Sequence, residues 1–325
     1  MPTSSEAPVG LLYHYTDRSG LRGILQSKHI WATHIEYLND SSEFKHAYSQ
    51  ASTDVLLNTL IPGINEALAT GIRETMLIGA AKYDAFVLSF TDDQSVHDDG
   101  CISPGDRLSQ WRSYGSGGGF SLGFDISLGL GGFDRFDFRR ASGTLWFYRC
   151  VYKDDERQQL FKSLGARGLQ KAFDMYARGI EDFKRENSRI PSDEEISAIA
   201  GRCGRQAISS VSSALFIQAG QFKHKAFCEE HEWRVIFFAL RETLSALRLA
   251  EPLSPILFER TGKSGPVPYI KYPLNLDQQD NPLRRIVVGP CPDLEGSVKE
   301  VESLLNANGI SGVDVEPSTI SYRYW

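Results

Sequence analysis

Apolar and polar residues alternate, or recur at regular intervals, over most of the chain, and the interval changes between segments. Short apolar or alternating runs between turn residues are typical of strands, whereas apolar residues three and four apart indicate helices. The pattern predicts a helix starting after Asp17, whose side chain is a suitable N-cap. We expect strands at 11–16, 30–35, 85–90, 120–124, 144–152, 232–240, 267–272 and 285–288, and helices over most of 43–83 and at 108–114, 155–220 and 294–305.

The predicted strands are short and unevenly spaced, which argues against a regular alternation of parallel strands and helices. The pattern therefore predicts the α+β class, with a single domain over residues 11–325. The segment at 155–220 predicts a helical insertion, interrupted near residues 187–191. For residues 1–10 we expect a disordered tail. The apolar stretch at 320–325 is expected to dock on the domain.

Composition argues against several classes of protein. The 325 residues carry a net charge of −6, which argues against non-specific binding to nucleic acid through phosphate neutralisation. The five cysteines are widely spaced and form no Cys-x-x-Cys pair, so we expect neither a disulfide framework nor a zinc site. No basic and apolar leader and no membrane-spanning run is found, so the sequence predicts a cytoplasmic protein without a membrane partner.

Several common site patterns are incomplete in this chain. The run Gly262-Lys263-Ser264 resembles the end of a phosphate-binding loop, but Leu257 stands where that loop needs its first glycine. The glycines at 115–119 precede a strand, whereas a dinucleotide-binding turn precedes a helix. His231-Glu232 begins like a zinc-protease helix, but Val235 replaces the second histidine. The sequence predicts no metal site.

Three clusters of polar and aromatic side chains remain as candidates. They are Tyr13-His14-Tyr15-Thr16, then Ser89-Phe90-Thr91, and finally the carboxylate pair Glu230 and Glu232. If residues 230–234 are extended, both carboxylates lie on one face, together with Arg234 as a neutralising cation. Each cluster also has a purely structural interpretation: a histidine in the core, hydroxyls that end a strand, and a solvated acidic turn with one ion pair.

The order of these clusters resembles two protein groups. A bacterial domain family of unknown function shares the pattern formed here by Tyr13-His14-Tyr15-Thr16, Leu38-Asn39-Asp40-Ser41-Ser42-Glu43-Phe44, Ser89-Phe90-Thr91, Trp111-Arg112-Ser113-Tyr114 and Glu230-His231-Glu232-Trp233-Arg234. The order also resembles the ADP-ribosyltransferase fold, which implies a mixed, mainly antiparallel β core of short strands with flanking helices. This chain has Thr91 where the transferase pattern favours serine, and Phe90 in place of tyrosine.

The transferase resemblance implies NAD as substrate and an oxocarbenium-like transition state, in which a carboxylate stabilises developing positive charge. Glu232 would take that role, and Glu230 would orient or activate the acceptor as a general base. The NAD-binding residues implied are His14, Tyr15, Thr16, Ser89, Phe90, Thr91, Trp111, Arg112 and Tyr114. The acceptor of ADP-ribose could be protein, nucleic acid or water, and the resemblance implies a toxin or antiviral defence effector with an inhibitory partner protein.

Two other functions stay open. A sensing module would bind a nucleotide or nucleic acid in the same cleft without turning NAD over, and Glu230 and Glu232 would then serve recognition or structure. A nuclease or phosphotransferase would use the acidic loop that begins at Asp92 and Asp93 to hold Mg²⁺.

Overall fold

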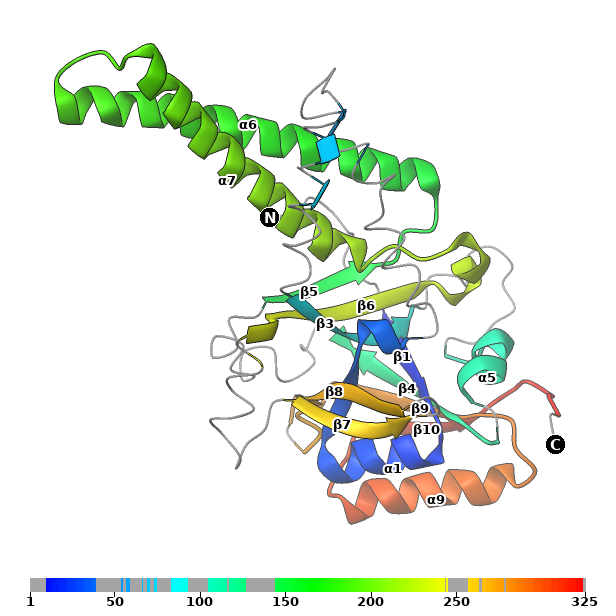
Figure 1. Cartoon of the computed structure of the whole chain (residues 1–325). Helices are drawn as coiled ribbons and strands as arrows, with labels where there is room; N and C mark the ends of the chain where they lie inside the picture. Colours follow the sequence, from blue (N-terminus) through cyan, green and yellow to red (C-terminus); the bar gives the residue numbers. More distant parts are fainter. Residues whose placement is uncertain are drawn as a thin grey trace. The chain divides into compact units, whose positions relative to one another are not determined.

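The computed structural model (Figure 1) describes residues 10–38, 83–92, 105–115, 117–126, 144–242, 257–262, 265–277 and 279–323, with a few single positions elsewhere. The predicted tail, apart from Gly10, and most of the predicted helical segment at 43–83 lie outside these residues. Two compact units are present, one formed by residues 1–38, 85–150 and 226–325, the other by residues 39–84 and 151–225. The single domain over 11–325 stays a prediction.

A ten-stranded sheet forms the centre of the first unit and confirms the α+β class. Its strands are β1 (Leu11–Thr16), β2 (His29–His34), β3 (Tyr83–Thr91), β4 (Phe120–Asp125), β5 (Thr144–Arg149), β6 (Glu232–Leu240), β7 (Leu257–Gly262), β8 (Gly265–Pro273), β9 (Leu283–Val288) and β10 (Asp314–Pro317). The main path runs β10-β9-β4-β1-β3-β2-β8-β7, and β6 pairs with β3 and β5. The β10–β9 pair is parallel, whereas β1–β4, β2–β8, β4–β9, β5–β6 and β7–β8 are antiparallel.

The main hydrophobic core lies against one face of this sheet. Helices α1 (Arg18–Ser27) and α9 (Leu294–Ala307) contribute Leu21, Leu25 and Val301 to it. Alternate residues of the central strands form the rest of the cluster. They include Leu12, Phe86, Leu88, Phe90, Phe124, Trp233, Val235 and Phe237. As predicted, Asp17 caps α1 by accepting a hydrogen bond from the Gly20 amide, at 2.7 Å.

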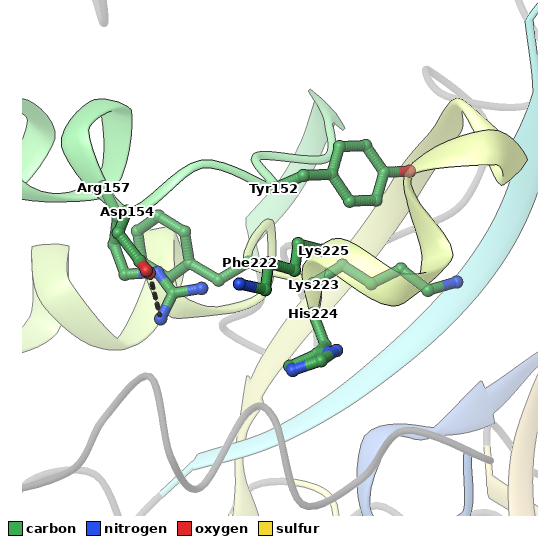
Figure 2. A pocket seen from close by; sticks show the side chains of 7 residues that line it. All are labelled: Tyr152, Asp154, Arg157, Phe222, Lys223, His224 and Lys225. Carbon is green, nitrogen blue, oxygen red and sulfur yellow. Dashed lines mark ion pairs between the residues drawn. The ribbon is translucent and has the colours of Figure 1, made fainter.

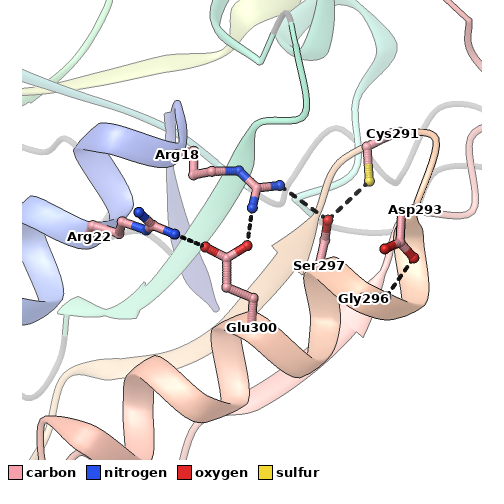
Figure 3. A network of polar contacts seen from close by, with 7 residues as sticks. All are labelled: Arg18, Arg22, Cys291, Asp293, Gly296, Ser297 and Glu300. Carbon is pink, nitrogen blue, oxygen red and sulfur yellow. Dashed lines mark hydrogen bonds and ion pairs between the residues drawn. The ribbon is translucent and has the colours of Figure 1, made fainter.

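Polar contacts at the surface join the two helices that cover this core (Figure 3). Glu300 of α9 pairs with Arg18 and, at 2.6 Å, with Arg22 of α1. Arg18 also donates to the Ser297 hydroxyl. The arginine side chains are 44% and 52% exposed, so the ion pairs orient the helices but contribute little to stability compared with the apolar core.

The opposite face of the sheet carries a smaller aromatic cluster of Tyr13, Tyr15, Trp111 and Val287. Trp111 lies on α5 (Leu108–Tyr114), the short helix predicted from the sequence. Its ring is 1% exposed. Gly105 has a φ of +77° and approaches the Tyr13 ring so closely that a Cβ would lie 2.3 Å from it, so this position requires glycine.

In the second unit, α6 (Asp154–Asn187) and α7 (Asp193–Ala219) pack against each other, and they occupy the stretch where the sequence predicts helices with a break near 187–191. The break follows from local signals. Ser188 ends α6 in the left-handed conformation, and Ser192 with Glu195 forms a reciprocal capping box that starts α7.

Candidate functional site

Three segments that are far apart in the sequence meet in the first unit, where β3 ends, β6 begins and β1 passes beside α5. The Thr91 hydroxyl donates to the Glu230 carbonyl. The Asp92 amide donates to the His231 carbonyl at 3.2 Å. The Arg107 amide, just before α5, donates to the Tyr15 hydroxyl at 3.1 Å. We call this hydrogen-bonded region the junction, and it joins members of all three sequence clusters.

Arg107 connects the parts of the junction. Its guanidinium donates to the Asp92 carbonyl at 2.8 Å and to the Glu229 carbonyl at 3.0 Å, and the residue is only 7% exposed. Among the described residues, no carboxylate forms an ion pair with it. A buried guanidinium without a counter-charge is costly, and an anionic ligand would relieve that cost. Sequence reasoning missed Arg107, because no periodicity or motif distinguishes it from a loop arginine.

Two buried polar atoms near the start of β6 lack hydrogen-bond partners. Asp92 accepts from the Trp233 indole through Oδ2 at 3.1 Å, but its Oδ1 has no partner. The Tyr148 hydroxyl on β5 also has none, and Tyr148 stands opposite Arg234 in the β5–β6 register. Buried polar atoms are rarely left unpaired. Within the part of the chain that the structure describes, the hydrogen-bonding capacity of both atoms is therefore unused.

Glu232 is the first residue of β6 and forms a buried ion pair with Arg234, as the sequence predicts. Both guanidinium-to-carboxylate distances are 3.0 Å, and the side chains are 6% and 4% exposed. The Cys150 thiol approaches Oε2 at 3.6 Å. Because the arginine is charged at all ordinary pH values, this arrangement favours an ionised Glu232.

Glu230 does not continue this strand. It ends the 3-10 helix η4 (Lys225–Glu230), and His231 follows with a φ of +44° before β6 starts. The condition for placing Glu230 and Glu232 on one face, an extended chain through both, is therefore not met. A positive φ is costly for a histidine and persists only where the surrounding contacts enforce it. Here the Asp92 amide binds the His231 carbonyl and so fixes the turn.

The predicted block Trp111-Arg112-Ser113-Tyr114 divides between the interior and the surface. The Trp111 ring contacts the Tyr15 ring edge-on at 4.7 Å between centroids, and its indole donates to Asp106 at 2.7 Å. The Arg112 guanidinium lies over the Tyr322 ring at 5.3 Å, and Tyr114 is 38% exposed. Trp111 therefore forms a wall behind Tyr15, whereas Arg112 and Tyr114 remain at the surface.

Asp106 holds the C-terminal segment to this wall. Besides the Trp111 indole, its carboxylate accepts from the Ser318 hydroxyl at 2.6 Å, and from the Thr319 amide and hydroxyl at 2.7 and 3.0 Å. Ile320 packs against the same aromatic cluster, in agreement with a docked C-terminal stretch. Four donors to one carboxylate indicate a structural role, and no local sequence pattern indicated this contact.

His14 lies on the other face of the sheet from Glu232. Its ring contacts Phe90 of the main core at 6.0 Å between centroids, and Nδ1 bonds the Ser89 carbonyl at 3.0 Å. Successive strand residues point to opposite faces, and Trp233, the neighbour of Glu232, belongs to that same core. The structure therefore brings Tyr15, Thr91 and Glu230 together at the junction, but it does not join His14, Thr16 or Phe90 to them.

Because the ring of His14 is buried, we expect the folded protein to lose stability in acid. Burial lowers the pKa of its ring below the ordinary value of 6.5, against a smaller opposing effect of the Ser89 carbonyl. Unfolded His14 then takes up a proton at a higher pH than folded His14, so stability falls as the pH drops through and below about 6.5. We expect urea denaturation to show a larger loss between pH 7.5 and 5 for the wild type than for His14→Gln, which cannot titrate. Equal losses would show that another group causes the effect.

Burial likewise raises the pKa of the Tyr15 hydroxyl, although the Arg107 amide and Ser121 stabilise its oxygen. Tyr15 therefore stays protonated.

The metal-dependent alternative receives no support from the described residues, which contain no group of three potential metal-binding His, Cys, Asp or Glu side chains. Asp92 is 1% exposed, and Asp93 lies outside the described residues.

One family model matches part of the chain. It is described as "Protein of unknown function (DUF2971)" and matches residues 110–235, a stretch that includes most of α5 together with Glu232 and Arg234. The resemblance to a domain family of unknown function is thereby confirmed over these residues. No curated protein and no solved structure matches the chain. Within the part of the chain that the structure describes, no helix is both long and apolar enough to cross a membrane.

Proposed function

We propose that this chain, whose residues 110–235 match a domain family of unknown function, is an ADP-ribosyltransferase-like enzyme that binds NAD at the junction. The observation that carries the proposal is the meeting of Tyr15, Thr91 and the segment at 229–232 around Arg107, a buried cation without a carboxylate partner among the described residues. The diphosphate of NAD is an anion that such a guanidinium binds well. The mainly antiparallel sheet is compatible with the transferase-like fold.

In this proposal the carboxylate of Glu232 stabilises the positive charge that develops on the ribose as nicotinamide departs. No acid is required, because the cationic nicotinamide leaves as a neutral molecule. Arg234 keeps the carboxylate ionised, and Glu230 at the adjacent turn serves the acceptor as a general base. Tyr15, backed by Trp111, supplies an aromatic wall for the ligand. His14 acts indirectly, by holding the Ser89 carbonyl.

The acceptor of ADP-ribose is a protein, a nucleic acid or water, and the reaction belongs to a cytoplasmic toxin or antiviral defence effector. Uncontrolled consumption of NAD harms the producing cell, so an inhibitory partner protein forms part of the proposal.

A test of Glu232 requires a variant that keeps the charge of the buried ion pair. Glu232→Gln would remove one charge of the buried pair with Arg234, so lost activity could reflect lost folding. Glu232→Asp keeps the charge but withdraws the carboxylate by one methylene, and misplacement of about 1 Å at a reacting centre costs about a hundredfold in rate. We expect nicotinamide release, measured by chromatography with NAD and a cell lysate, to fall by at least about a hundredfold.

The matched control is Glu242→Asp, the same substitution at an exposed position beyond β6, which should leave the rate unchanged. Thermal melting should show that Glu232→Asp remains folded. A rate equal to that of the wild type would remove Glu232 from the chemistry.

A second function is favoured by one observation, namely that Arg234 occupies both oxygens of Glu232. A carboxylate held in this way suits a sensing module that binds a nucleotide or nucleic acid without chemistry. Calorimetry separates the two functions. A module binds NAD or another nucleotide with no release of nicotinamide by the wild type, whereas the enzyme releases it.

A further inference from the structure

The second unit contains a pocket that the proposed NAD chemistry does not use (Figure 2). Its volume is about 280 Å³, and its lining residues are Tyr152, Asp154, Arg157, Phe222, Lys223, His224 and Lys225. Two short segments form it, the start of α6 with the residues before it, and the chain that follows α7. All of these residues lie within the stretch matched by the family model.

Backbone contacts fix these two segments against each other. Val151 forms a parallel bridge with Phe222, its amide donates to the Gln221 carbonyl at 2.8 Å, and the Lys223 amide donates to the Val151 carbonyl at 3.1 Å. The Phe222 ring packs edge-on against Phe161 of α6, at 5.2 Å between centroids. The pocket therefore rests on a hydrogen-bonded and apolar base, so its shape is set before a ligand arrives.

The charge of the lining is positive. Among the lining residues that the structure describes, Arg157 and Lys225 carry positive charge beside Lys223, and Asp154 supplies the carboxylate. The distance from the Arg157 guanidinium to that carboxylate is 3.7 Å, and the Asp154 side chain is 82% exposed, so this contact is long and well solvated. Asp154 therefore neutralises little of the positive charge, and the pocket suits an anion.

Arg157 is held in place but keeps bonding capacity. Its guanidinium lies over the Phe222 ring at 5.2 Å, which fixes the plane of the group. Its Nε is buried and has no hydrogen-bond partner among the described residues. The side chain is 19% exposed, so its terminal N–H groups can donate to the oxygens of a phosphate group. The ring of Tyr152 lines the same pocket, on the side away from Arg157, and provides an aromatic surface there (Figure 2).

We propose that this pocket binds a phosphate monoester that carries an aromatic or heteroaromatic group. Arg157 and Lys225 hold the phosphate, and Tyr152 contacts the ring. The proposal does not depend on NAD turnover, because it concerns another set of residues and is measured without NAD.

Isothermal titration calorimetry of the full chain tests it, with phenyl phosphate, inorganic phosphate and phenol as probes. We expect phenyl phosphate to bind, inorganic phosphate to compete with it, and phenol to do neither. Arg157→Gln removes a charge-assisted donor and should weaken phenyl phosphate binding at least about tenfold. Lys225 is exposed, so Lys225→Gln leaves folding unaffected and should weaken binding about two- to fivefold.

The matched control is Arg167→Gln, the same change of charge at an exposed position of α6 outside the pocket, which should bind like the wild type. Unchanged affinity in both Arg157→Gln and Lys225→Gln would overturn the proposal. Absence of phenyl phosphate binding, or phenol binding as tight as that of the phosphate ester, would overturn it as well.

Discussion

Arg234→Met should lower the free energy of unfolding by about 3–5 kcal/mol, the usual cost of breaking a buried ion pair from one side. Methionine fills part of the volume but leaves the carboxylate of Glu232, 6% exposed, without its cation. The Cys150 thiol approaches the same carboxylate at 3.6 Å, but a thiol is a weak donor and does not replace a cation. Urea denaturation followed by circular dichroism measures the change.

Two controls separate charge from packing. The double variant Glu232→Gln with Arg234→Met removes both charges, so it should recover part of the stability lost by the single variant. Arg18→Met breaks an exposed ion pair with Glu300 and should cost less than about 1 kcal/mol. If Arg234→Met costs no more than Arg18→Met, water reaches the β6 pair and its burial is not as described.

Trp111→Ala should cost about 3–5 kcal/mol, because a ring that is 1% exposed is replaced by a cavity. Tyr15 loses the ring behind it, and Asp106 loses one of its four donors. Thermal denaturation measures the loss of stability. Limited proteolysis of the segment at 318–323 should show faster cleavage, because Asp106 also holds that segment through Ser318 and Thr319.

Trp111→Phe distinguishes the two contributions, since it keeps most of the ring but removes the indole donor. Its expected cost is about 1–3 kcal/mol, that of an unpaired buried polar group. Trp31→Ala is the control for tryptophan removal at a position that is 42% exposed, and should cost less than either. Equal losses of stability for Trp111→Ala and Trp31→Ala would contradict the burial of the Trp111 ring behind Tyr15.

Sequence reasoning succeeded where local signals decide the structure. Asp17 caps α1, and Glu232 pairs with Arg234 two residues along the same strand. Helix α6 ends at the start of the predicted break, and α7 begins two residues beyond it. Each of these depends on residues only a few positions apart, so the pattern itself contains the information. Strands β7 and β10 were not predicted, because they pair as short edge strands with little apolar alternation.

The rest of the site depends on contacts between distant segments. Alternation shows which residues of one strand share a face, but only the pairing of β1, β3 and β6 decides whether the faces of two strands coincide. His14 and Glu232 lie on opposite faces of the sheet. Arg107 and Asp106 were missed for a similar reason, since their partners lie up to 213 positions away in the sequence.

The strand order has a consequence for the order of folding. Strand β4 lies between β1, the first strand of the sheet, and β9, which is completed only at Val288. On the ribosome, β4 therefore waits for more than half of the chain before its second edge is paired, and such long-range pairing is slow to form. Ser318 and Thr319 follow β9 in the chain, so the carboxylate of Asp106 gains three of its four donors only after β9 has been synthesised. The contacts around α5 and β1 therefore become complete late in folding.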